Sequence, residues 1–147
     1  MNVTLEQYFH DPRTGIDKPH TLEQRALADE LLDRVNALLQ AYDQWRLSQG
    51  LAPAPICPHT GCYISGSPGG AGDGGFRLPS SSTGASKSSH KEARAVDVWD
   101  PSGDLDAWAN DERLTQYALY REHPDATKGW CHLTTRAPGS GRRTFQP

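Results

Sequence analysis

The sequence predicts an α+β fold, in which a small, mostly antiparallel sheet packs on a long N-terminal helix and long irregular loops join the elements. One observation is an apolar stripe at three- and four-residue steps through residues 21–47, which is typical of an amphipathic helix. A second is the alternation over residues 93–98, which with the pattern at 130–135 favours two strands. The third is the composition, because 14 glycines, 11 prolines and only 35% hydrophobic residues indicate much irregular loop.

The length and charge of the chain narrow its class. A chain of 147 residues fits one domain, which we expect to span residues 1–147. Within it we expect a helical part at about 1–50, a core that carries the functional site at about 60–135, and a C-terminal tail at 136–147. The formal net charge of −3 favours neither a nucleic acid nor a membrane as partner.

The N-terminus carries no basic region followed by an apolar stretch, and no apolar run approaches the length of a transmembrane helix. We therefore expect a protein that is made in the cytoplasm without a signal peptide. Its three cysteines are an odd number, which argues for reduced thiols rather than a disulfide framework. No pattern reports the oligomeric state, and a monomer is the expectation.

The N-terminal helices are predicted from their caps. Thr4 can cap a short first helix, and a polar loop follows from His10. The segment from Thr21 to Gln24 is a capping box, and the periodic stripe behind it predicts about seven helical turns that end near Gly50. We expect this stripe to pack on the protein's own core rather than on a partner. The stripe consists of Leu27, Leu31, Val35, Leu38, Tyr42 and Trp45.

The middle of the chain is predicted to be mostly loop. Residues 62–65 are a short strand candidate, and the glycine-rich segment 66–75 lacks the Gly-Lys-Ser/Thr ending of a phosphate-binding loop. A structural zinc at Cys57, His59 and Cys62 is disfavoured, because the spacing is wide and no second ligand pair follows. The Ser/Gly run at 80–89 leads into His90, and we interpret it as a tethered loop beside a functional site.

Three candidate metal ligands follow in the second half of the chain. His90 precedes a strand on which Asp97 shares a face with Ala93 and Ala95. A second strand carries His132, and the preceding residue, Cys131, should point to the opposite side as a small core residue. Two histidines and one aspartate suit zinc and leave a fourth tetrahedral position open for water.

The segments around these strands are predicted as helices and loops. Asp104 can cap a helix over residues 105–109, and a second helix is expected over residues 112–120. Residues 121–125 form a polar loop that is rich in titratable groups. The basic tail at 136–147 is expected to lie over the surface.

The pattern Ser88-x-His90-x-x-Ala93-x-Ala95-x-Asp97, with Trp130-x-His132 far downstream, resembles a known motif. It is similar to that of the zinc peptidases of the D-alanyl-D-alanine carboxypeptidase, or hedgehog/DD-peptidase, type. The element Phe76-Arg77-x-Pro79 is also similar to one that precedes the first ligand in this family. The resemblance covers residues 60–135, and the tail resembles that of phage-encoded members.

Two positions depart from the family pattern. The motif glycine is Ala93 here, and many members carry an acid three residues before the last histidine, where this chain has Gly129. The general base must then come from another residue. We favour Glu122, then Asp125, with His123 as a further candidate. The opposing interpretation is that Glu122 only caps or solvates a helix end.

The resemblance implies zinc-dependent hydrolysis of peptide bonds in bacterial peptidoglycan, in a stem peptide or a cross-link. His90, Asp97 and His132 would hold the Zn²⁺. Arg77 would bind a substrate carboxylate or steady the oxyanion, and Ser88 would hydrogen-bond the substrate or a ligand. If phage-encoded, the protein would act on the cell wall after release or as part of a virion.

Two alternatives remain open from the sequence. One is a catalytically silent domain of this fold, serving as a phage virion or tail component or as a wall-binding module. The other is a metal-free domain in which the two histidines and the aspartate are a hydrogen-bonded core. Zinc deaminases, helical His-Glu-x-x-His peptidases and serine hydrolases fit less well, because their further motifs are missing.

Overall fold

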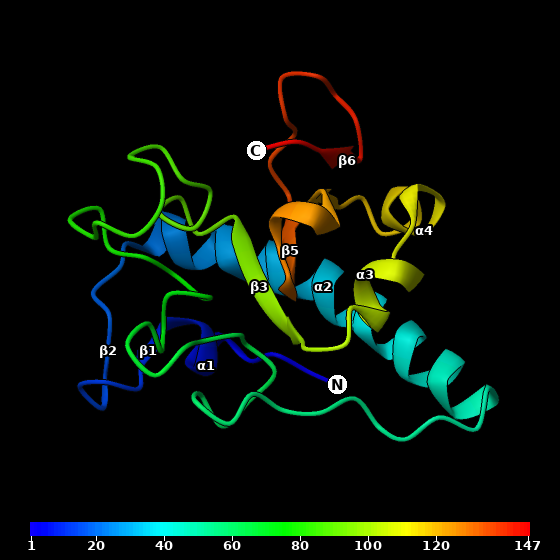
Figure 1. Ribbon diagram of the computed structural model, residues 1–147. Helices are drawn as coiled ribbons and strands as arrows, with labels where there is room; N and C mark the ends of the chain where they lie inside the picture. Colours follow the sequence, from blue (N-terminus) through cyan, green and yellow to red (C-terminus); the bar gives the residue numbers. More distant parts are fainter.

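The long helix α2 (Leu22–Ser48) lies behind a four-stranded sheet, and the α+β prediction is confirmed (Figure 1). The computed structural model describes residues 1–147. The strand order in the sheet is β3-β5-β4-β6. These strands are β3 (Ala95–Asp100), β4 (Tyr120–Glu122), β5 (Gly129–Thr134) and β6 (Thr144–Phe145).

Helix α2 has the predicted cap and the predicted buried stripe. The Thr21 hydroxyl accepts the N–H of Gln24, whose side-chain oxygen accepts the N–H of Thr21, so the capping box is formed. The helix ends before Gly50, whose φ of +68° is a conformation that glycine adopts at low cost. Seven residues of α2 are buried in the core: Ala28, Leu31, Leu32, Val35, Leu38, Leu39 and Tyr42.

The segment before α2 joins the core through aromatic side chains. Helix α1 (Leu5–Phe9) is capped by Thr4, as predicted, and the Tyr8 hydroxyl donates a 2.8 Å hydrogen bond to the carbonyl of Ala95. The polar loop predicted from His10 is instead a small hairpin, because the strands β1 (His10–Asp11) and β2 (Ile16–Asp17) pair across the turn. The strand candidate at 62–65 forms a single bridge between Ile64 and Val98.

The two faces of the sheet have different surroundings. Val96, Val98, Cys131 and Leu133 are buried in the same apolar cluster as the stripe of α2, so this face packs on the helix. Cys131 therefore points into the core, as predicted. The opposite face carries the intervening residues of β3 and β5, because side chains alternate along a strand. Asp97 and His132 lie on that face.

The connection from β3 to β4 contains two short helices, α3 (Asp104–Trp108) and α4 (Asp111–Gln116). The prediction that Asp104 caps α3 is wrong. The Asp100 carboxylate instead accepts the N–H groups of Leu105 and Asp106, at 3.0 and 2.9 Å. Helix α4 is shorter than predicted, since Ala118 adopts a φ of +54° and the Leu119 N–H bonds back to the Leu114 carbonyl.

Two segments predicted as loop or surface tail complete the sheet. Residues 120–122 form β4, which pairs antiparallel with β5, and the short helix η1 (Pro124–Ala126) follows. The C-terminal tail does not merely lie over the surface, because Thr144 and Phe145 pair parallel with β4 as β6. A three-residue charged strand has no local signature of its own, so only its pairing with β5 and β6 makes it a strand.

Candidate metal centre

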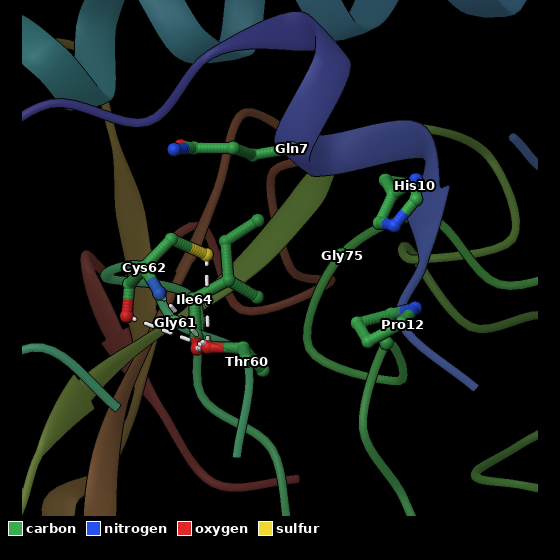
Figure 2. Close-up of a pocket in the computed structure, with 9 residues that line it drawn as sticks. Gln7, His10, Pro12, Thr60, Gly61, Cys62, Ile64 and Gly75 are labelled. Carbon is green, nitrogen blue, oxygen red and sulfur yellow. Dashed lines mark hydrogen bonds between the residues drawn. The ribbon is translucent and has the colours of Figure 1, made fainter. Parts of the chain in front are cut away.

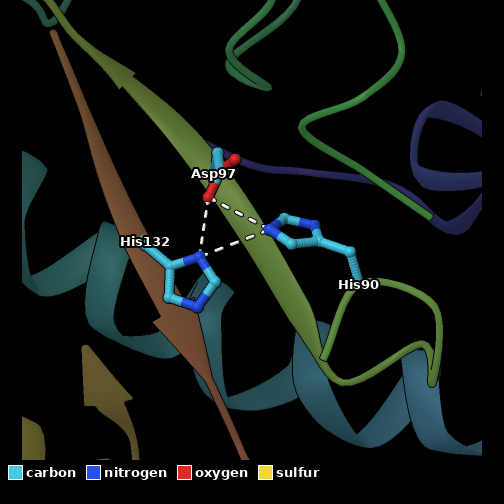
Figure 3. Close-up of side chains that lie close together, drawn as sticks. All are labelled: His90, Asp97 and His132. Atoms are coloured by element: carbon cyan, nitrogen blue, oxygen red, sulfur yellow. Dashed lines mark hydrogen bonds and ion pairs between the residues drawn. The ribbon is translucent and has the colours of Figure 1, made fainter. Parts of the chain in front are cut away.

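His90, Asp97 and His132 converge on one point beside the sheet (Figure 3). His132 Nδ1 lies 2.9 Å from Asp97 Oδ1. His90 Nε2 lies 3.3 Å from the same oxygen and 3.3 Å from His132 Nδ1. All three residues are buried: His90 is 2% exposed, Asp97 7% and His132 6%. The sequence-predicted ligands are therefore brought together.

The sheet register positions two of these ligands. Asp97 on β3 and His132 on β5 are direct cross-strand partners, and partners of this kind lie on the same face with their Cβ atoms about 5 Å apart. His90 comes from the turn before β3. Its Nδ1 lies 2.9 Å from the Gly75 carbonyl, which can only accept, so Nδ1 carries the hydrogen. Its Nε2 then faces the other two candidate ligands.

The donor set fits a bound cation. Zinc takes nitrogen and oxygen ligands at about 2.0–2.2 Å, and in a tetrahedral site such ligand atoms lie about 3.3 Å from one another. The three separations here, 2.9 to 3.3 Å, match that arrangement. His90 Nε2 and Asp97 Oδ1 lie 3.3 Å apart in a buried place, so they need a positive charge between them, which a proton on Nε2 or a bound cation can supply. The contact from His90 to the Gly75 carbonyl is the kind of outer interaction that orients a metal-ligating histidine.

The electrostatics of the cluster favour an ionised carboxylate. Burial opposes ionisation of Asp97, but attraction to His90 and hydrogen bonds with both histidines outweigh it and hold the pKa of Asp97 well below its ordinary range. Burial favours a neutral His132 ring, but its hydrogen bond to Asp97 and the negative charges of Asp97 and Glu122 raise the pKa of His132. The cluster therefore stabilises positive charge next to Asp97.

Glu122 lies beside the cluster because of β4. Arg121 pairs with Leu133, and continuing this register puts Glu122 opposite His132. Its Oε1 is 3.9 Å from His132 Nε2, the ring nitrogen that faces away from Asp97. On the other side, Glu122 pairs with Phe145 of β6, whose ring meets the His132 ring edge to face. One row of side chains thus crosses the whole sheet.

The other two predicted catalytic residues lie farther from the cluster. The Asp125 side chain is 85% exposed, and its Oδ2 lies 3.5 Å from His123 Nδ1. The ring of His123 accepts the N–H of Asp125 at the start of η1. Neither residue lines the cavity that contains the metal ligands, whereas Glu122 does. Of the three candidates for a general base, the structure brings only Glu122 to the site.

Arg77 contacts the ligand Asp97 directly. Its Nη2 donates to Asp97 Oδ2 at 3.5 Å, and its Nε donates to the Asp73 carbonyl at 2.6 Å. The guanidinium therefore has an anchored position, while the residue still lines the cavities around the site. The Ser88 hydroxyl accepts the N–H of His90 at 3.3 Å and lines the same cavity as the metal ligands.

Two cavities adjoin at the ligand cluster. One, of about 410 Å³, contains all three ligands and is also lined by Glu122 and Phe145. The other, of about 440 Å³, lies on the side of the glycine-rich loop. The cavities share Arg77, Asp97 and Trp130. Sequence reasoning did not anticipate Phe145, which reaches the site only through the pairing of β6.

The two departures from the family pattern have structural counterparts. Ala93 is buried and has a φ of +59°, a left-handed conformation that disfavours residues with a Cβ. A glycine at this position would therefore match the backbone better. Gly129 has a φ of +102°, which an acidic side chain would adopt only with strain, although open space surrounds its Cα. The backbone at position 129 therefore disfavours an acid there.

No second cluster of metal ligands is present. His90, Asp97 and His132 are the single group of three or more histidine, cysteine or acidic side chains that could share an ion. The Cys57 thiol donates to the Gly66 carbonyl, and the Cys62 thiol contacts the Thr60 hydroxyl. Figure 2 shows the contact of Cys62, which lines a small cavity of about 110 Å³. His10 also lines this cavity, but no carboxylate does.

None of the helices combines the length with the apolar composition that is needed to cross a bilayer. Comparison of the chain with protein-family models, with curated proteins and with solved structures finds no match.

Proposed function

We propose that the protein is a zinc-dependent peptidase that hydrolyses peptide bonds of bacterial peptidoglycan, in a stem peptide or a cross-link. The observation that carries the proposal is the convergence of His90 Nε2, Asp97 Oδ1 and His132 Nδ1 within 3.3 Å of one another at a cavity. The motif that these residues form resembles that of the D-alanyl-D-alanine carboxypeptidase family. That resemblance supports the substrate class.

His90, Asp97 and His132 would hold the ion. Zinc, when bound there, supplies Lewis-acid chemistry that acidifies water and polarises the scissile carbonyl. Arg77 keeps Asp97 oriented through its Nη2 contact, and the Gly75 carbonyl keeps His90 in the tautomer that presents Nε2. These two contacts support the proposal because they fix ligand geometry before any ion binds.

Glu122 is the proposed general base. It would take a proton from the attacking water and deliver it to the leaving amine, which requires a carboxylate within reach of the cavity. Glu122 lines that cavity and is the candidate nearest the ligands. Arg77 lines the cavity and would steady the oxyanion or a substrate carboxylate. Ser88 would hydrogen-bond the substrate backbone at the same cavity.

One observation favours a second candidate function. Position 129, where many members of the resembling family carry an acid, has no side chain and a backbone that disfavours one. A catalytically silent domain that binds zinc and serves as a phage virion or tail component, or as a wall-binding module, would need no base. The proximity of Glu122 to His132 favours the peptidase over this alternative.

The test is zinc content measured together with peptidoglycan hydrolysis. Purified protein should hold about one zinc per chain, and it should release peptide fragments and clear a peptidoglycan suspension. A chelator should abolish clearing, and added zinc should restore it. Zinc without release of any fragment, from walls of several cross-link chemistries, would favour the silent domain. Protein that binds no zinc would refute both proposals.

A further inference from the structure

The four tryptophans of the chain divide into two pairs with different surroundings. Trp45 and Trp108 pack against Tyr42 and against each other at the apolar core. Trp99 and Trp130 lie outside that core cluster, and neither ring packs against another aromatic ring. Two large, half-buried aromatic side chains therefore lie outside the apolar core.

Trp99 and Trp130 are placed beside the metal ligands by the sheet. They are direct cross-strand partners on β3 and β5, two residues along each strand from Asp97 and His132. Because successive side chains point to opposite faces of a strand, both tryptophans lie on the face that carries the candidate ligands. They are about 7 Å from these ligands along the strands. Both also line the cavity of about 440 Å³ that adjoins the ligand cluster.

Apart from the two tryptophans, this cavity is lined by polar residues and four glycines. The tryptophans are its only apolar side chains, and no Leu, Ile, Val, Met or Phe lines it. Ser65 is 9% exposed and lines the cavity. The other polar side chains at the cavity are those of Ser67, Asp73, Arg77, Thr83, Asp97 and Lys128.

This combination selects a ligand with an apolar flat face and hydroxyl groups at its edge. An aliphatic peptide side chain would call for aliphatic walls, which the cavity lacks. A nucleotide would bring phosphate to Asp73 and Asp97, and the two carboxylates balance the charges of Arg77 and Lys128. A pyranose ring meets both requirements, since its C–H face can stack on indole while its hydroxyls bond the polar side chains.

We propose that Trp99 and Trp130 form a sugar-binding subsite beside the metal centre, which takes a pyranose ring of the N-acetylated glycan strand. The choice of an amino sugar rests on the proposed function, whereas the subsite itself rests on the cavity. The glycan of the substrate would then bind within one or two peptide units of the ligand cluster, so the bond that is cut would lie near the attachment of the peptide to the sugar.

The subsite can be tested without turnover. The probe is chitotetraose, a soluble chain of four N-acetylglucosamine units, and binding is followed by saturation-transfer NMR on the sugar and by calorimetric titration. Wild-type protein should transfer saturation to the sugar. Trp99→Ala and Trp130→Ala should each weaken binding by about tenfold, the scale expected for losing one aromatic stacking contact. The milder Trp99→Phe and Trp130→Phe variants should keep part of the binding and serve if an alanine variant fails to fold.

The matched control is Trp108→Phe, the same change at a tryptophan of the core. It should lower the melting temperature and leave sugar binding unchanged. No saturation transfer in the wild type, or equal binding by folded Trp99 and Trp130 variants, would overturn the subsite. Hydrolysis of free stem peptides without sugar binding would remove the subsite and leave the proposed function. Sugar binding by a protein that hydrolyses no peptide bond would support the subsite and contradict the proposed function.

Discussion

Replacing Glu122 with glutamine distinguishes a general base from a residue that only orients His132. Glutamine keeps the size of the side chain but cannot accept a proton at neutral pH, so a general base is lost. General bases contribute about 100- to 10,000-fold to rate, which corresponds to about 2.7–5.4 kcal/mol in the barrier. We expect Glu122→Gln to lose hydrolysis by that factor, measured as release of peptide fragments from purified peptidoglycan.

Zinc binding should survive this substitution. Glu122 Oε1 lies 3.9 Å from His132 Nε2, whereas Nδ1 is the His132 atom that faces Asp97 and would bind the ion, and the glutamate side chain is 27% exposed. A partly exposed pair at this distance contributes roughly 0–1 kcal/mol, so the melting temperature should change by only a few degrees. Zinc per chain should stay that of the wild type.

The matched control is Asp125→Asn, which makes the same chemical change three residues later. Asp125 is largely exposed and lies outside the cavity, so hydrolysis should be unchanged. Full activity of Glu122→Gln would refute the assignment, and loss of activity in Asp125→Asn would move it to that residue. A fall of about 10- to 100-fold in zinc affinity in Glu122→Gln would instead identify a residue that orients His132.

Three further predictions follow from the structure. Asp97→Ala should reduce bound zinc from about one per chain to near zero and lower the melting temperature on the order of 10 °C, because metal binding stabilises the folded state. Unchanged zinc by elemental analysis would refute its role as a ligand. Ala118→Gly should raise the free energy of unfolding by about 0.5–1 kcal/mol in urea titrations, since Ala118 is exposed and its φ of +54° suits glycine, and no change would contradict the strain. Burial raises the pKa of Tyr8 above its ordinary value of 10, so above pH 10 the unfolded chain releases this proton and the folded protein keeps it. Stability should therefore fall by up to about 1.4 kcal/mol per pH unit as pH rises past 10, and Tyr8→Phe, although less stable at neutral pH, should lose that part of the slope.

The candidate ligands could be named from the sequence because each sits in a short local pattern. His90 follows a run of small residues, Asp97 lies in an alternating strand, and His132 lies two residues after Trp130 in a second strand. Residue types that bind metals can be found in any sequence. The resemblance to a peptidase motif indicated which of them form one ligand set. Their distances could not be predicted, because these depend on the register that pairs Asp97 with His132.

The general base was harder to predict for a physical reason. Residues 121–125 contain several titratable groups, and in a loop any of them could face the metal. The structure makes residues 120–122 a strand, which turns Arg121 toward the buried Asp106 and Glu122 toward the ligands. Alternation along β4 thus selects Glu122, and this selection exists only once β4 pairs with β5.

The sequence by itself determined the elements that depend on local interactions. The capping box before α2, the apolar stripe along it and the alternation in β3 each act over a few residues, so they can be read without the fold. Only the tertiary structure decided what lies side by side. It pairs β6 with β4, brings the Gly75 carbonyl to His90, and makes Trp99 and Trp130 cross-strand partners on the face that carries the candidate ligands. These contacts join segments far apart in the chain, and their register is chosen by burial of the opposite face against α2.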